Sequence, residues 1–464
     1  MRKLIILALL FFVSCNIEND KPGLIHQQSE MADPKVCIIG FDGATWRSLD
    51  RALEMDLMPN LERLIQTGVH GPLHTIHPTI TTVIWTSIAT GKLPEKHGIT
   101  NIIVQDVKTK TMKPISSTQV RVKPIWKILS DRKKSVEIIR WPVTWPAMEV
   151  NGVLVSEFAF QETRDRRCYP PAVCQLVDRF YPNYRLKDIE TLTGIDRDTY
   201  RNLDPSWQWK LLVLLKEYNL DILFRDVAKE LLKNEQKSFT TVYFYSMDTL
   251  GHNYFKFNEG FTEDLDTPDF SRIIPNWCWL YDQFLGEILG LLDPDTYVII
   301  CSDHGMDLAL EPVNYLIRSE NDPPQKDKND SAPAVDPAPD YDADPMQIHM
   351  RYTLPTGQHV DAPDGIFVMK GPGIHQGQTL ANINVCDIAP TVLYCLDQPV
   401  AMDFDGKPLL QAFEESHIKD HPLAFVETYE TSDAQPADSL APNNAYSKED
   451  ERLIDRLRAM GYVR

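Results

Sequence analysis

Five apolar runs, separated by segments with helical spacing, constrain the fold of this chain more than any other feature of its sequence. The runs are VCIIGF (Val36–Phe41), 136–139, TTVYFYS (240–246), TYVIIC (296–301) and 366–369. A strand that is apolar along its whole length suits the middle of a parallel sheet, because helices cover both of its faces. Helical patterns occupy 59–67, 124–129, 221–233 and 277–292. The alternation predicts an α/β fold with a mainly parallel central sheet.

The first residues have the pattern of a targeting segment. Arg2 and Lys3 precede an apolar run at 4–13, which is too short to span a bilayer as a helix but suits a secretory signal. The run ends in Val-Ser-Cys at Cys15, which resembles the cleavage box of bacterial lipoproteins. An ordinary signal peptide that ends near a cysteine is the alternative. We expect residues 1–14 to be a signal peptide and 15–33 a flexible linker. The protein would then be exported and held on a bacterial membrane by lipid on Cys15, facing the periplasm or the cell exterior.

Charge and cysteine content restrict the partners. The formal net charge is −19, so a nucleic-acid duplex is not expected as a partner, because binding to its phosphates needs a basic surface. A small anionic substrate remains compatible with this charge, since bound metal ions reverse the local field. None of the eight cysteines has zinc-ligand spacing, so any metal would be held by histidine and carboxylate. Cys168 and Cys174 are close enough in sequence to pair in an oxidising compartment.

Acidic residues and histidines follow three of the apolar runs. Asp42 follows the first run, Asp248 and His252 follow the run at 240–246, and Asp303 and His304 follow the run at 296–301. An Asp after a strand is commonly a turn residue or a helix cap. Recurrence at three strand ends favours a metal site instead, because the carboxyl ends of parallel strands meet at one edge of the sheet. For the further ligand, spacing leaves His359, His349, His375 and His97 open.

A hydroxyl-rich segment supplies candidates for a nucleophile. Residues 78–91 read PTITTVIWTSIATG, a polar start that continues into a helix ending at Gly91. The start of a helix presents unpaired N–H groups and the positive end of the helix dipole, which suits phosphate. Metal coordination would lower the pKa of a hydroxyl there and make it a nucleophile. The alternative is that Thr79, Thr81 and Thr82 serve only as helix caps.

Several motifs in order resemble the type I phosphodiesterase/nucleotide pyrophosphatase family of the alkaline-phosphatase superfamily. They are FDGATW (41–46), TSIATGKLPEKHGI (86–99), WPVTWP (141–146), SDHG (302–305), GQHVDAPDGIFVMKGPGI (357–374), DIAPTVLYCL (387–396) and DGKPLL (405–410). The resemblance runs from Val36 to the C-terminus, apart from the stretches 160–235 and 319–348. It implies an alkaline-phosphatase-like three-layer αβα core with a mainly parallel central sheet and an inserted cap.

The resemblance assigns site residues position by position. Asp42, Thr81, Asp303 and His304 match the first metal set of the family, and Thr81 matches the nucleophile. Asp248, His252 and His359 match the second set. Two divalent ions, zinc or else manganese, are therefore expected, and so is a phospho-threonine intermediate on Thr81.

One position departs from the expected pattern and leaves specificity open. The resemblance leads us to expect an Asn three residues after the nucleophile, whereas this chain has Ile84 there, which puts nucleotide-diester preference in doubt. The predicted activity is hydrolysis of small, possibly nucleotide-like phosphate diesters. The alternatives are a phosphomonoesterase, a transferase of phospho-headgroups and a non-catalytic surface lipoprotein that binds ligands. Trp85, Tyr254 and aromatic residues of the stretch 160–235 are candidates for stacking on a base or sugar.

The expected organisation follows from these assignments. Catalytic core would occupy 34–159 and 236–464, and an inserted cap 160–235, which is rich in Arg, Tyr, Trp and Asp. The Pro- and Asp-rich stretch 319–348 is predicted to be a mobile loop, because it has little apolar surface to bury.

Overall fold

The computed structural model describes residues 33–105, 112–181, 186–260, 269–309, 356–359 and 363–430. The described residues from Pro34 onward group into one compact unit. The predicted signal peptide, Cys15, the predicted loop 319–348 and His349 lie outside the described residues. Within the described part of the chain, no helix combines the length and apolar character that a membrane crossing requires.

A ten-stranded sheet forms the centre of the fold. From one edge to the other its strands are β13 (Gln378–Thr379), β2 (Val69–His74), β12 (Gly365–Lys370), β9 (Tyr297–Cys301), β1 (Val36–Phe41), β8 (Phe239–Phe244), β5 (Val136–Ile139), β6 (Gly152–Val155) and β7 (Cys168–Tyr169), with β14 (Ile383–Asn384) also paired to β2. The pairs among β9, β1, β8, β5 and β6 are parallel, whereas β12 runs antiparallel to both of its neighbours. The predicted mainly parallel sheet is confirmed.

The remaining strands pair outside the central sheet. They are β3 (Ile103–Gln105) with β4 (Met112–Pro114), β10 (Asp307–Leu308) with β11 (Gly357–Gln358), and β15 (Val400–Ala401) with β16 (Phe425–Val426). The α-helices are α1 (Trp46–Glu54), α2 (Pro59–Thr67), α3 (Thr81–Thr90), α4 (Pro94–His97), α5 (Ile125–Asp131), α6 (Cys174–Phe180), α7 (Leu186–Thr193), α8 (Arg197–Asn202), α9 (Pro205–Leu232), α10 (Ser246–Asn258), α11 (Ile273–Leu289), α13 (Ile388–Cys395) and α14 (Glu415–Asp420). Short 3-10 turns are η1 (Ser117–Gln119), η2 (Pro171–Val173), η3 (Val385–Asp387) and η4 (Leu410–Ala412).

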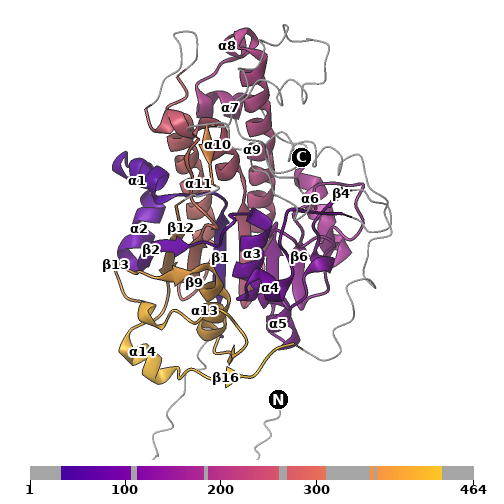
Figure 1. Cartoon of the computed structure of the whole chain (residues 1–464), viewed down its shortest axis with the longest axis vertical. Coiled ribbons are helices and arrows are strands. Elements are labelled where there is room, and N and C mark those ends of the chain that lie inside the picture. Colours follow the sequence, from indigo (N-terminus) through magenta and orange to yellow (C-terminus); the bar gives the residue numbers. More distant parts are fainter. Residues whose placement is uncertain are drawn as a thin grey trace, which may run out of the picture. The chain divides into compact units, whose positions relative to one another are not determined.

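Helices cover both faces of the sheet, which gives three layers. In β1, Cys37, Ile39 and Phe41 pack into a core shared with α1, α2, α9, α10 and α11. Val36 and Ile38 point the other way, into a core shared with α3, α5 and α13. Because successive side chains of a strand alternate between its faces, a wholly apolar strand requires two apolar layers. Figure 1 shows α3 and α13 over the strands of the sheet.

The stretch 160–235, predicted as a cap, contains β7, η2 and α6 to α9. β7 pairs with β6 at the sheet edge, and Cys168 of β7 forms a disulfide with Cys174 at the start of α6. The predicted helix at 221–233 is the second half of the 28-residue α9, which Figure 1 shows as a long helix. Leu223 and Val227 of that half belong to the core on one sheet face. The role of this stretch as a cap stays a prediction.

The predicted strand boundaries differ by a few residues at one functional position. The run at 240–246 forms a strand only to Phe244, and Ser246 already begins α10. Asp248 and His252 therefore stand one turn apart on the first part of a helix, on the same face, rather than on a loop.

Candidate metal centre

Six of the seven predicted metal ligands lie together beyond the carboxyl ends of three neighbouring parallel strands. Asp42 follows β1, Asp248 and His252 lie on α10 after β8, Asp303 and His304 follow β9, and His359 follows β11. All six side chains are buried. The order β9-β1-β8 places three strand ends side by side, which brings together residues from distant parts of the chain.

The imidazole of His304 stands at the middle of this cluster. Its Nε2 lies 3.3 Å from Asp303 Oδ2, 3.8 Å from Asp42 Oδ1 and 4.0 Å from Asp248 Oδ1. Ligands about 2 Å from one ion are separated from each other by roughly these distances. Asp42, Asp303 and His304, which the sequence assigns to one metal set, are thus close enough to share an ion.

Asp248 joins this group to a second one. Its Oδ1 lies 3.5 Å from Nε2 of His252 and 3.9 Å from Nε2 of His359. The ligand atoms of Asp248, His304 and His359 all lie within 4.8 Å of one another. The structure therefore holds two adjoining groups of possible ligands, and His304 contacts both, whereas the sequence assigned it to the first alone.

Each of the three histidines is oriented by a contact of its Nδ1 atom outside the cluster. Nδ1 of His304 lies 2.9 Å from the carbonyl oxygen of Gly305, and Nδ1 of His252 lies 3.2 Å from that of Gly357. Nδ1 of His359 lies 3.3 Å from the hydroxyl of Thr79. An N–H donated by Nδ1 leaves Nε2 as the atom with a free electron pair, which is the arrangement of metal-binding histidines.

Four atoms of the cluster are buried without a hydrogen-bond partner among the described residues: Asp42 Oδ1, Asp248 Oδ1, Asp303 Oδ2 and His304 Nε2. Buried polar atoms are nearly always paired, because an unpaired one loses its hydration without compensation. All four are electron-pair donors that face each other, so no proton can satisfy them all. This donor set fits divalent cations, which the oxygen and nitrogen ligands would satisfy together.

The electrostatics of the cluster also favour bound cations. Burial, together with the nearby carboxylates of Asp303 and Asp248, raises the pKa of Asp42 well above its usual value. Burial raises the pKa of Asp303 as well. For Asp248, burial acts in the same direction, but the neighbouring His252 and His359 outweigh it and lower its pKa. Three carboxylates in one buried site repel each other, so positive charge between them would stabilise the folded protein.

Two residues that the sequence did not assign hold Asp42 in place. The indole N–H of Trp85 donates to Asp42 Oδ2 over 2.9 Å, and the hydroxyl of Tyr243 donates to the same oxygen. With Oδ2 held, Oδ1 faces His304. Trp85 is fully buried, as is Tyr254, so the prediction that these rings stack on a substrate is wrong.

Glycine is required where the loop after β1 meets α10. Gly43 has φ +66°, and a Cβ atom there would lie 2.8 Å from the Cα of Asp248. The backbone N–H of Gly43 also donates to Asp303 Oδ1 over 3.2 Å. The Asp-Gly pair at the end of β1 thus lets three strand ends approach closely.

Thr81 begins α3, whose N-terminal end is tied to the cluster on both sides of this residue. Thr79 donates its hydroxyl to the carbonyl oxygen of His359. Trp85, which contacts Asp42, lies four residues after Thr81 and thus on the same helix face. Ile80 is the N-cap and has no side-chain acceptor for the first N–H groups of the helix. An uncapped start of this kind suits an anion.

Ile84, the position that departs from the expected pattern, is fully buried in the apolar core that packs against α3. The backbone carbonyl oxygen of Asn101 lies near the start of α3, where it accepts from the hydroxyl of Thr82 over 3.0 Å. Preference for diesters stays a prediction.

Of the competing histidines, His97 and His375 are among the described residues, and neither belongs to the two ligand groups. His97 is buried below α3, with Nε2 2.9 Å from the Ser87 hydroxyl and Nδ1 accepting from the Ile99 N–H. Burial lowers the pKa of His97 to about 4, so its ring is neutral. His375 belongs to neither ligand group found among the described residues.

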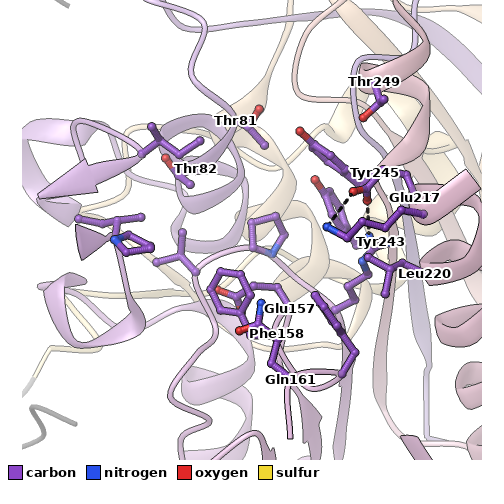
Figure 2. A pocket seen from close by; sticks show the side chains of 18 of the residues that line it. Thr81, Thr82, Glu157, Phe158, Gln161, Glu217, Leu220, Tyr243, Tyr245 and Thr249 are labelled. Atoms are coloured by element: carbon purple, nitrogen blue, oxygen red, sulfur yellow. Dashed lines mark hydrogen bonds and ion pairs between the residues drawn. The ribbon is translucent and has the colours of Figure 1, made fainter. Parts of the chain in front are cut away.

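A pocket of about 200 Å³ opens beside Thr81. Figure 2 shows Thr81 and Thr82 on one side and Tyr245, Glu217 and Leu220 on another. Its other lining residues include Tyr243, Phe158, Arg140 and Glu157. Since Tyr243 also holds Asp42, the pocket and the cluster share a wall.

Comparisons with known proteins give the following matches. The model of a family described as type I phosphodiesterase/nucleotide pyrophosphatase matches residues 36–360. Murine ectonucleotide pyrophosphatase/phosphodiesterase 5, solved as an inactive variant with AMP, is 15% identical, with 82% of this chain and 100% of that chain covered and a TM-score of 0.49. The human protein of that name is 17% identical, with 83% and 99% covered and a TM-score of 0.46. Phosphonoacetate hydrolase from Sinorhizobium meliloti, solved with phosphonoformate, is 18% identical, with 60% and 57% covered and a TM-score of 0.37. No match was found among curated proteins.

Proposed function

Because the chain belongs to the type I phosphodiesterase/nucleotide pyrophosphatase family, a family of metal-dependent phosphoester hydrolases, we propose that it hydrolyses small phosphate diesters with Thr81 as the nucleophile. The observation that carries this proposal is the pair of adjoining Asp/His groups beside the uncapped start of α3. Thr79, two residues before Thr81, and Trp85, four residues after it, bond to the cluster.

Two divalent cations, zinc or manganese, would be held by the two groups. Asp42, Asp303 and His304 would hold one ion, with Thr81 as a further ligand. Asp248, His252 and His359 would hold the other. When bound, the ions would neutralise charge on the phosphoryl oxygens and lower the pKa of a coordinated hydroxyl.

The residues of the chain itself would bind and orient the ester. Backbone N–H groups at the start of α3 would donate to a phosphoryl oxygen, and the helix dipole favours the negative charge there. The hydroxyl of Thr81 would attack phosphorus in line with the departing oxygen, forming a phospho-threonine that water then opens. The pocket lined by Phe158, Tyr245 and Leu220 would take one ester group.

Two substitutions at one position test the nucleophile. We expect Thr81→Ala to abolish turnover of bis(p-nitrophenyl) phosphate, and Thr81→Ser to retain part of it because the hydroxyl is kept. In the wild-type protein, acid quenching followed by peptide mass spectrometry should find phosphate on Thr81. Turnover in Thr81→Ala close to that of the wild type would exclude the assignment.

Product analysis separates the alternatives. Release of a free monoester from a diester, with no phosphoryl group passed to added alcohols or glycans, would support hydrolysis. A modified acceptor would show a transferase, and turnover of monoesters alone would show a phosphomonoesterase. A protein that binds zinc or manganese but turns over none of these esters would be a binding protein.

We also propose that the protein is exported and anchored through Cys15. The disulfide between Cys168 and Cys174 supports export, because disulfides persist in oxidising compartments. Labelled fatty acid should be incorporated into the wild-type protein and not into Cys15→Ser. Equal labelling of the two proteins would exclude this anchor.

A further inference from the structure

A second hollow adjoins the Thr81 pocket beside α9. It measures about 380 Å³, and its wall includes Phe160, Lys216 and Leu220, all of which also line the Thr81 pocket. The residues that line only this outer hollow are Tyr181, Leu212, Leu215 and Asn219. Because three side chains belong to both walls, the two hollows meet. We call the second one the outer groove.

The spacing of its residues on α9 shows the direction of the outer groove. Leu220, Lys216 and Leu212 are four residues apart and therefore lie on one face of the helix. Leu220 and Lys216 line both hollows, and Leu212 lines only the outer groove. Eight residues of helix extend about 12 Å at a rise of about 1.5 Å per residue. The outer groove thus follows α9 for roughly two helical turns beside the Thr81 pocket, which Val213 and Leu220 of the same helix also line.

The outer groove is mostly apolar, although it is open to solvent. Leu212 is 46% exposed and Tyr181 is 42% exposed, which places both among the few large apolar side chains that the described surface exposes. The ring of Tyr181 is stacked on that of Phe160 at 6.4 Å between centroids and 22° between planes. Apolar side chains gathered around an open hollow commonly mark a binding site.

We propose that the outer groove binds an apolar extension of the substrate, namely an alkyl or arylalkyl chain on the ester group that enters the Thr81 pocket. This inference rests on the proposed reaction at Thr81. The occupant is assigned to the substrate because the groove is continuous with the reaction pocket through three shared side chains. Lys216 lies at the junction and lines both hollows.

A series of p-nitrophenyl alkyl phosphates tests the inference on the full-length protein. Methyl, butyl and octyl esters share the same reacting bond and leaving group, and differ only in the chain that the groove would hold. We expect kcat/KM to rise by about tenfold from the methyl to the octyl ester, since each methylene placed against apolar walls adds binding. The methyl ester serves as the internal reference for the reaction itself.

Two matched substitutions locate the effect. Leu212→Ser should lower the octyl-to-methyl ratio of kcat/KM by about threefold, because it removes an apolar wall of the outer groove. Leu93→Ser replaces another exposed leucine (37% exposed), which lines neither hollow, and should leave the ratio unchanged.

The outcomes distinguish this inference from the function on which it rests. Turnover of the methyl ester with no gain for longer chains would overturn the outer groove alone. An octyl preference that Leu212→Ser leaves intact would do the same, because the chain would then bind elsewhere. Failure to turn over any of the three esters would overturn the proposed hydrolase, and the inference with it.

Discussion

The hydrogen bond from Tyr243 to Asp42 provides a test of the metal centre that leaves every proposed ligand in place. Tyr243→Phe removes one hydroxyl and keeps the ring, which packs edge-on against Trp85 at 5.1 Å between centroids. Asp42 Oδ2 would keep the indole N–H of Trp85 and lose its other donor. The carboxylate would then be held less firmly with Oδ1 toward His304.

The expected loss follows from the kind of bond that is removed. A hydrogen bond to a charged group contributes about 1.5–3 kcal/mol, which corresponds to roughly 10–100-fold in affinity. Losses of about the same size follow when residues that orient metal ligands are removed. We therefore expect zinc to bind Tyr243→Phe about 10–100-fold more weakly than the wild-type protein.

The pH dependence gives a second readout with a defined sign. Burial raises the pKa of Asp42, and the Tyr243 hydroxyl opposes that rise. Losing the hydroxyl raises the pKa further. Since a carboxyl group must lose its proton to bind a metal ion, the midpoint of zinc binding should move to higher pH.

Competition with a chromophoric chelator measures zinc affinity in the wild type, in Tyr243→Phe and in a control. Tyr429→Phe is the matched control, because it also removes a tyrosine hydroxyl bond, to the Pro399 carbonyl over 2.6 Å, without contacting the cluster. If Tyr243→Phe binds zinc as tightly as Tyr429→Phe across the pH range, Asp42 is not a ligand that Tyr243 orients.

Three further predictions concern stability. Removing metal with EDTA should lower the Tm in scanning calorimetry, because the buried carboxylates lose their counter-charge, and added zinc should restore it; an unchanged Tm would contradict this. Glu137 is buried on β5, and burial raises its pKa from 4.5 to about 7. The folded state therefore holds the proton of the Glu137 carboxyl group more tightly than the unfolded state does. The stabilisation that this proton gives the folded state is complete below about pH 4.5 and is lost as pH rises through about 7. In urea unfolding, the free energy of unfolding of Glu137→Gln should therefore equal that of the wild type at pH 4.5 and exceed it by on the order of 3 kcal/mol at pH 8. Equal free energies at both pH values would refute this. Asp221 accepts hydrogen bonds from Arg140, from the Ser246 hydroxyl and from the Tyr281 hydroxyl. Asp221→Asn should therefore lower the free energy of unfolding in urea by about 3–5 kcal/mol. A decrease of less than about 1 kcal/mol would contradict the assignment of a buried ion pair.

The positions at strand ends were predictable from sequence for a physical reason. Continuous apolar runs identify central strands, and the residues that follow parallel strands must meet at one edge of the sheet. This pattern alone was enough to predict that Asp42, Asp303 and His304 lie together at that edge. His359 was different, because spacing left four histidines open and only a resemblance chose among them. The structure places His359 in the cluster through β11, a two-residue strand too short to recognise in sequence.

The residues that orient the ligands could not be predicted in this way. Trp85 and Tyr243 contact Asp42 from α3 and β8, and those contacts depend on how separate elements pack. An aromatic residue in an apolar segment reads as core or as a stacking surface, and sequence does not reveal which of its polar atoms finds a partner. The full length of α9 did have a signal, because Asp204 followed by Pro205 is a helix start, and Asp204 accepts from the Ser206 N–H there.

Helix α3 links the nucleophile to the ligands at one end and is clamped at the other. Thr79, just before the helix, bonds to His359, and Trp85 in the helix bonds to Asp42. Beyond its last residue, the carbonyl oxygen of Gly91 accepts from the Asp405 N–H over 2.9 Å, and Lys92, almost fully buried, pairs with Asp403 over 2.8 Å. A helix held at both ends cannot slide along its axis without breaking bonds at both, so Thr81 and its neighbouring ligands must keep a fixed spacing. Loosening the distal clamp should therefore disturb the nucleophile and the metal ligands together.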